Sequence, residues 1–272
     1  MTDLSLLLPM LALLLAIGAF AGIIAGLLGV GGGLVLVPAY LYAFEAMGYG
    51  GPSLMRVCLA TSLATIIVTS LRSVHAHHRK GAVDLEILRR WGLWIALGAV
   101  AGTFLASSMK SVVLQGIFGG VGVAVGLYMA FGRTSWRLGE SLPQGAARAA
   151  TGTGVGLLSV LMGIGGGTVG VPLMSLFNVP IHRAVATAAG FGVIIALPSA
   201  ALFLFTPTDA APPLTVGAVN LPAFGITIAM TLLTTPIGVK LAHAMDPKPL
   251  KRVFAVFIMI VALNMLRKAF LA

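Results

Sequence analysis

Two runs of three glycines stand in otherwise apolar sequence, and they are the residues best suited to hold a solute. The first run consists of Gly31, Gly32 and Gly33, and the second consists of Gly165, Gly166 and Gly167. Both fit the pattern G-[VI]-G-G-G-x-V-x-V-P, which ends at Pro38 and at Pro172. Each glycine costs a helix roughly 1 kcal/mol relative to alanine. Inside a membrane, the backbone groups that the glycines free need partners other than lipid.

We therefore expect two broken helices to meet at the glycines near the middle of a membrane. Free N–H groups and the positive N-termini of helices would bind an anion there. Pro38 and Pro172 would each release a backbone acceptor and bend the second helix of the pair. The alternative is that the glycines only allow close helix packing. Because equivalent triple glycines occur twice, we favour the binding site.

Hydroxyl side chains follow each glycine run and would add hydrogen-bond donors to the site. Thr61, Ser62 and Thr65 lie near the start of one apolar segment, and Thr187 holds the matching place in a later one. Thr61 and Thr65 are one helical turn apart and share a face. The alternative is that these hydroxyls bond to carbonyls of their own helices.

Basic residues flank the same segments and suggest a positive path for an anion. They are Arg56, Arg183 and His182 before the hydroxyl-bearing segments, and Arg72 and His75 after the first of them. A positive funnel is typical of anion pores. The alternative is that each side chain only extends to the membrane surface.

The acidic residues and the single cysteine exclude several other kinds of chemistry. All seven Asp and Glu residues fall in loops or at segment ends, which argues against a proton relay through carboxylates and against a cationic substrate. Cys58 stands alone, and no nucleotide-binding or hydrolase motif is present. We expect no metal, no cofactor and no enzymatic activity.

The composition is that of a polytopic membrane protein. Of the 272 residues 58% are hydrophobic and only 9% are charged, against about 25% charged in soluble domains. The formal net charge of +10 comes from basic residues scattered over short loops. Positive-inside orientation explains them better than binding of nucleic acid, which we do not expect.

Ten apolar segments position these residues, five in each half of the chain. They fall at 4–28, 33–44, 54–72, 91–107, 111–131, 147–166, 168–180, 184–205, 216–242 and 252–271. Their length predicts helices, and the second segment of each half is too short to cross a membrane comfortably. We predict an all-α fold with one transmembrane repeat in residues 1–132, a cytoplasmic linker in 133–146 and a second repeat in 147–272.

The basic loops predict that the two repeats have opposite orientations. The loop after the third segment contains Arg79, Lys80 and further basic residues, whereas its counterpart 206–215 contains none. Corresponding loops then face opposite sides of the membrane, with both termini outside the cell.

The doubled glycine pattern, the Ala60-Thr61-Ser62 stretch and the loop His78-Arg79-Lys80-Gly81-Ala82-Val83-Asp84 resemble the TauE/SafE family of sulfite and organosulfonate exporters. The resemblance covers nearly the whole chain. It implies a bacterial inner-membrane transporter of small sulfur-containing anions, such as sulfite, sulfoacetate or thiosulfate. We expect export by alternating access, with the small anion and the lipid bilayer as partners, and assembly into a homo-oligomer stays open. The alternatives are an importer of the same anions and a membrane scaffold or accessory subunit that transports nothing.

Overall fold

The computed structural model describes residues 4–28, 32–132, 136–244 and 247–271. This part of the chain forms ten helices and one two-stranded antiparallel sheet. The helices are α1 (Leu4–Leu28), α2 (Gly33–Ala46), α3 (Leu54–His78), α4 (Leu85–Ser108), α5 (Ser111–Phe131), α6 (Gly145–Leu161), α7 (Gly167–Leu176), α8 (Ile181–Phe203), α9 (Leu221–Ala244) and α10 (Pro247–Leu271). The strands are β1 (Thr215–Val216) and β2 (Val219–Asn220).

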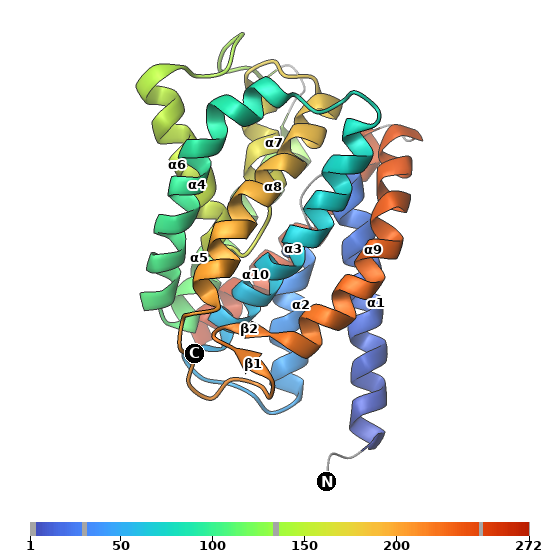
Figure 1. Ribbon diagram of the computed structural model, residues 1–272, viewed down its shortest axis with the longest axis vertical. Helices are drawn as coiled ribbons and strands as arrows, with labels where there is room; N and C mark the ends of the chain where they lie inside the picture. The colour runs from blue at the N-terminus through green and yellow to red at the C-terminus, as the bar shows by residue number, and fades with distance from the viewer. Residues whose placement is uncertain (1–3, 29–31, 133–135, 245–246, 272) are drawn as a thin grey trace.

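The long helices run between two ends of the molecule (Figure 1). We call the end that carries β1 and β2 the hairpin end, and the opposite end, where the described linker residues 136–144 lie, the linker end. Helix α3 runs from the hairpin end to the linker end, and α8 runs in the opposite direction. The helices α1 and α6 are likewise opposed. Matching helices of the two halves are therefore inverted.

The contacts between helices repeat when the two halves are exchanged. Helix α1 packs on α9, and α6 packs on α4, which is the same pair in the other half. The pairs α3–α8 and α5–α10 each join matching helices. Most of α3 and α8 is buried, so these two helices form the centre of the bundle. Residues of the predicted site on α3 and α8 are thereby brought into the core.

Helix lengths and apolar surfaces suit a membrane. Within the described residues, five helices are long and apolar enough to cross one, namely α3, α4, α5, α8 and the Leu221–Leu241 part of α9. Helices α2 and α7 have 14 and 10 residues, or about 21 and 15 Å, which is short of the roughly 30 Å hydrocarbon core. Leu93, Leu97 and Phe104 of α4 face outward, as a lipid-facing helix requires. The prediction of an all-α polytopic membrane protein is confirmed.

Two helix starts differ from the apolar segments because polar residues cap them. Helix α4 begins at Leu85 rather than 91, since the Asp84 carboxylate accepts hydrogen bonds from the N–H groups of Glu86 and Ile87, both 3.1 Å long. Helix α9 begins at Leu221 rather than 216, because residues 215–220 form the β1–β2 hairpin. The Asn220 side-chain oxygen accepts from the Ala223 N–H at 3.0 Å and starts that helix.

Candidate functional site

The described residues of each glycine run lie at the turn of a helical hairpin that enters the bundle and returns to its own side. Helix α1 rises from the hairpin end and α2 returns toward it, while α6 descends from the linker end and α7 returns there (Figure 1). Both α2 and α7 therefore begin inside the bundle, each at its glycines. Gly32 has φ of 79° and precedes α2, a conformation that glycine adopts without strain. Gly31 lies outside the described residues.

The two glycine turns touch each other. A Cβ atom placed on Gly33 would lie 2.4 Å from the carbonyl oxygen of Gly163 and 2.7 Å from the Cα of Ile164. The Ser62 hydroxyl donates a 2.7 Å hydrogen bond to that same carbonyl of Gly163. The first turn, the second turn and α3 thus meet at one point, and no anion fits between Gly33 and Gly163 in this conformation.

The second turn is equally close-packed, yet it carries hydroxyls that have no partner. A Cβ on Gly166 would lie 2.3 Å from the Cβ of Phe191 on α8, and the neighbouring Gly165 and Gly167 are buried. Ser159 and Thr168 are 0% and 3% exposed, and their buried hydroxyls have no hydrogen-bond partner among the described residues. Ser159 lies in the last turn of α6 and Thr168 in the first turn of α7, so both flank this glycine turn.

Pro38 and Pro172 lie inside α2 and α7 rather than at the interruptions. Both helices continue through the proline, and the chain turns at the glycines that precede them. A proline cannot donate to the carbonyl four residues earlier, which here is that of Leu34 or of Thr168. Each proline therefore leaves a carbonyl near the turn without the donor four residues later that a regular helix would supply.

Thr65 belongs to a buried hydroxyl cluster that joins three helices. The Tyr40 hydroxyl of α2 lies 2.7 Å from the Thr227 hydroxyl of α9 and 3.3 Å from the Thr65 hydroxyl of α3. Thr65 and Thr227 also donate to the carbonyls of Thr61 and Ala223 in their own helices. These polar groups satisfy one another and hold α2 against α3 and α9.

Thr61 and Thr187 occupy matching places and make matching contacts. The Thr61 hydroxyl oxygen accepts a 2.9 Å hydrogen bond from the backbone N–H of Asn220, and the Thr187 oxygen accepts a 3.0 Å bond from that of Asp84. Thr61 is near the hairpin end and Thr187 near the linker end. The structure therefore does not bring the two threonines together. Thr61 anchors α9, which follows Asn220, and Thr187 anchors α4, which follows Asp84.

The five predicted pathway residues divide between the two ends. Arg56 lies near the hairpin end, with guanidinium nitrogens 3.4 Å from the Pro207 oxygen and 3.5 Å from the Met109 oxygen. Four others lie near the linker end and are exposed, namely Arg72, His75, His182 and Arg183. Arg183 approaches the Asp84 carboxylate to 3.7 Å. About 24 Å of helix separates Arg56 from Arg72.

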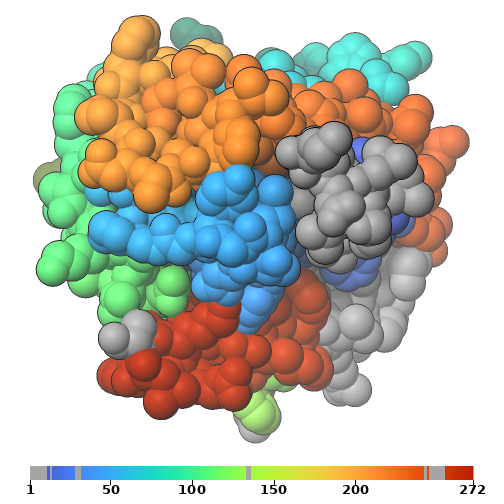
Figure 2. All heavy atoms as spheres, turned by 90° about the horizontal axis from the view of Figure 1, so that it is seen from below, coloured from blue at the N-terminus to red at the C-terminus, as the bar shows by residue number. Residues whose placement is uncertain are grey.

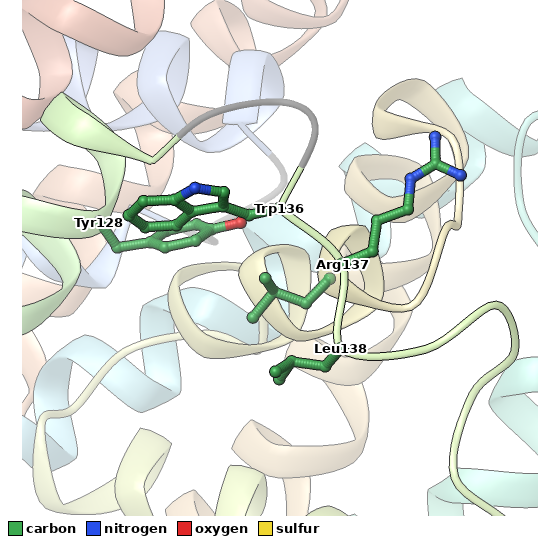
Figure 3. A pocket seen from close by; sticks show the side chains of 5 residues that line it. Tyr128, Trp136, Arg137 and Leu138 are labelled. Atoms are coloured by element: carbon green, nitrogen blue, oxygen red, sulfur yellow. The ribbon is translucent and has the colours of Figure 1, made fainter.

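A hollow of about 440 Å³ lies at the linker end, away from the glycine turns. It is lined by Tyr128, Trp136, Arg137, Leu138 and Leu176. Figure 3 shows the rings of Tyr128 and Trp136 lying one over the other, with Arg137 pointing away from them. This hollow is distinct from the predicted site. Among the described residues, no three His, Cys, Asp or Glu side chains gather as metal ligands would.

Sequence reasoning missed the hydroxyls of Tyr40, Ser159, Thr168 and Thr227. Thr168 stands where the first repeat has Leu34, and that difference was the only signal for it. The second repeat has Met174 at the place equivalent to Tyr40, so a comparison of the two halves does not point to a role for the tyrosine. Thr227 contacts α2 and α3 only through the fold.

Comparison with known proteins agrees with this architecture. Residues 14–265 match the family model described as sulfite exporter TauE/SafE. A probable membrane transporter protein of Haemophilus influenzae is 30% identical over 262 residues, which cover 94% of this chain and 98% of the relative. A probable membrane transporter protein of Methanocaldococcus jannaschii is 25% identical, over 94% of this chain and 96% of its own length.

A third relative, a probable membrane transporter protein of Bacillus subtilis, is 28% identical over 201 residues, which cover 64% of this chain and 71% of the relative. No solved structure is significantly similar to the chain. The family match spans both glycine turns and the α3 and α8 core, as the sequence patterns predict. The chain is a membrane transporter of the TauE/SafE family.

Proposed function

We propose that this chain exports a small sulfur oxyanion, such as sulfite, thiosulfate or sulfoacetate, without converting it chemically. The observation that carries the proposal is the meeting of two buried helix N-termini, those of α2 and α7, at glycine turns in the bundle core. Helix N-termini present unpaired N–H groups and partial positive charge, which favour anions. The description of the matching family, sulfite exporter, supports the sulfur oxyanion.

The site would be formed by the described glycines at both turns, together with Ser62, Ser159 and Thr168. In the closed arrangement Gly33 contacts Gly163, so binding requires the two hairpins to separate. Inverted repeats move against each other in this way when a carrier alternates its access. An expelled monovalent anion gains about 2.3 kcal/mol per 100 mV of negative-inside potential, so export needs no coupled ion.

We place the protein in a bacterial inner membrane with the linker end in the cytoplasm. Arg72, Arg79, Lys80, Arg89 and Arg90 all lie toward that end, which favours the cytoplasmic side. Both α1 and α10 then have their hairpin-end termini outside the cell. Impermeant labelling of a cysteine introduced at exposed Lys80 tests this orientation, and labelling in intact cells would contradict it.

Counterflow of labelled anion into proteoliposomes tests the function. We expect uptake of at least one of sulfite, thiosulfate and sulfoacetate, and loss of that uptake in Gly32→Leu and Gly166→Leu, which insert normally. Gly120→Leu is the matched control, because nothing lies within 4 Å of a Cβ at Gly120. Full activity of both turn variants would contradict the site.

The importer is the second candidate, since the same geometry serves either direction. It is distinguished by flux measured from each side of oriented vesicles under an imposed potential. The unfolding temperature in detergent distinguishes a carrier from a scaffold. A carrier is stabilised by its anion, whereas a scaffold is stabilised by none of sulfite, thiosulfate and sulfoacetate. Cross-linking in membranes tests whether the carrier is a homo-oligomer.

A further inference from the structure

We infer that the anion travels between the glycine turns and the linker end along one face of α3, the face that carries Ser70 and Ser73. This inference rests on the proposed function. Ile66, Ser70, Ser73 and His77 follow one another at intervals of four, three and four residues, so they share a face of the helix. All four are at most 1% exposed.

The first support is the state of the two serine hydroxyls. The Oγ atoms of Ser70 and Ser73 are buried and have no hydrogen-bond partner among the described residues. Nearly all buried polar groups in proteins are paired, and an unpaired one calls for a specific reason. A water molecule or an oxyanion that enters when α3 and α8 separate supplies the missing acceptor. Neutral O–H donors suit a small oxyanion, which they bind without trapping it.

The second support is that the half of α3 nearer the hairpin end is not built in this way. Toward the hairpin end, the hydroxyls of Thr61 and Thr65 are already bonded, to Asn220 and to Tyr40. Figure 2 shows α2 and its following loop in the middle of that end, between α10 and the segment near residue 200.

The matching face of α8 is less polar than that of α3. We align the two helices so that Thr61 matches Thr187. In this alignment Ala196 and Phe203 of α8 take the places of Ser70 and His77 of α3. Ser199, the counterpart of Ser73, has the carbonyl oxygen of Ala99 at 3.5 Å. Among the described residues of these two central helices, the unpaired buried hydroxyls are those of Ser70 and Ser73 on α3, which lead toward the linker end.

The third support is the contact that closes the path. A Cβ on Gly192 of α8 would lie 2.3 Å from the Ser70 Oγ, so α8 lies directly on the serine face. The Ile66 side chain is 2.8 Å from a Cβ on Gly33 and 3.7 Å from a Cβ on Gly192. Ile66 therefore fills the space between the first glycine turn and Ser70. An apolar side chain in that place blocks a hydrated path, as hydrophobic constrictions do in channels.

Cysteine accessibility tests the path. Ser70→Cys and Ser73→Cys are made in a Cys58→Ala background, with Ser199→Cys as the control because it is a buried serine at the matching place of α8. Membrane vesicles of both orientations are treated with an impermeant thiol reagent. We expect Ser70→Cys and Ser73→Cys to react at least about tenfold faster than Ser199→Cys, and only when the linker end faces the reagent.

Replacement of Ile66 tests the barrier. Ile66→Ala should speed the labelling of Ser70→Cys at least about threefold, whereas Ile95→Ala, an equally buried isoleucine of α4, should leave it unchanged. The inference is overturned if both cysteines on α3 react as slowly as Ser199→Cys in variants that still transport sulfite. If they react as expected but no sulfur oxyanion is transported, the path stands and the proposed substrate is wrong.

Discussion

Thr187 Oγ1 accepts a 3.0 Å hydrogen bond from the backbone N–H of Asp84, the residue that caps α4. The bond joins α8 of the second repeat to the start of α4 in the first. Thr61 and Asn220 make the same contact with the repeats exchanged, at 2.9 Å. The central helices α3 and α8 therefore each hold the residue that directly precedes the fourth helix of the opposite repeat, which is α9 for α3 and α4 for α8. The inverted repeat is visible at the level of single hydrogen bonds.

Thr187→Val should destabilise the protein, because the Asp84 N–H loses its acceptor while the side chain keeps its volume. A buried donor left unpaired costs about 1–3 kcal/mol. Thermal unfolding in detergent measures the change. Thr151→Val is the control, since Thr151 donates only to carbonyls of its own helix, at Ala147 and Arg148. Equal unfolding temperatures of the two variants would contradict a structural role for Thr187.

Tyr40→Phe should weaken the junction of α2 with α3 and α9. The substitution removes a hydroxyl that lies 2.7 Å from Thr227 and 3.3 Å from Thr65. Both threonines keep their bonds to carbonyls of their own helices, so the expected loss is only about 0.5–1.5 kcal/mol. Chemical denaturation followed by tryptophan fluorescence measures it. Tyr42→Phe, at an exposed tyrosine of the same helix, should lose less, and the reverse order would disprove the prediction.

Gly156→Ala should disrupt the contact between α6 and α4. A Cβ there would lie 2.0 Å from the carbonyl oxygen of Ile95. That oxygen belongs to the backbone of α4, so it can move away only if the whole helix moves. Overpacking of this type costs about 1–3 kcal/mol. Gly154→Ala is the control, because nothing lies within 4 Å of its Cβ and alanine favours a helix by about 1 kcal/mol. The unfolding temperature should fall for Gly156→Ala and rise for Gly154→Ala. A change in the same direction for both variants would contradict the prediction.

Local patterns in the sequence were enough to predict the ten helices and their interruption at the glycines. Apolar length, triple glycine and repetition are all properties of short stretches, and the structure follows them at Gly33 and Gly167. The interpretation of glycines as helix-packing residues also holds elsewhere, since Gly98 and Gly156 admit the backbone of the facing helix. Close helix packing at a glycine can thus be predicted from the local sequence alone.

Contacts between distant residues were beyond the reach of the same reasoning. The bond from Ser62 to Gly163 and the approach of Gly33 to that residue join segments more than a hundred residues apart. No period or motif encodes such a meeting. The sequence of the β1–β2 hairpin predicts the start of a helix instead, because its two-residue strands are too short to show alternation. The binding role of Ser62, Thr65 and the glycines stays a prediction.

Thr168→Val separates a role in transport from a role in stability. Thr168 is 3% exposed and its hydroxyl has no partner among the described residues, so valine removes an unpaired buried group at nearly constant volume. The unfolding temperature should therefore stay the same or rise. Transport should fall by about tenfold, since a donor worth about 1.4 kcal/mol to the bound oxyanion is lost.

Counterflow of labelled sulfite, with unfolding measured on the same preparations, checks both outcomes. Thr103→Val is the matched control, because its buried hydroxyl already bonds to the Ala99 carbonyl at 2.8 Å and lies on α4, outside the glycine turns. That variant should keep its transport rate, and its unfolding temperature should change little, because the hydroxyl bonds only to a carbonyl of its own helix. If Thr168→Val transports at the normal rate, the hydroxyl does not contact the anion. The site would then have to be formed by the backbone N–H groups of the two turns alone.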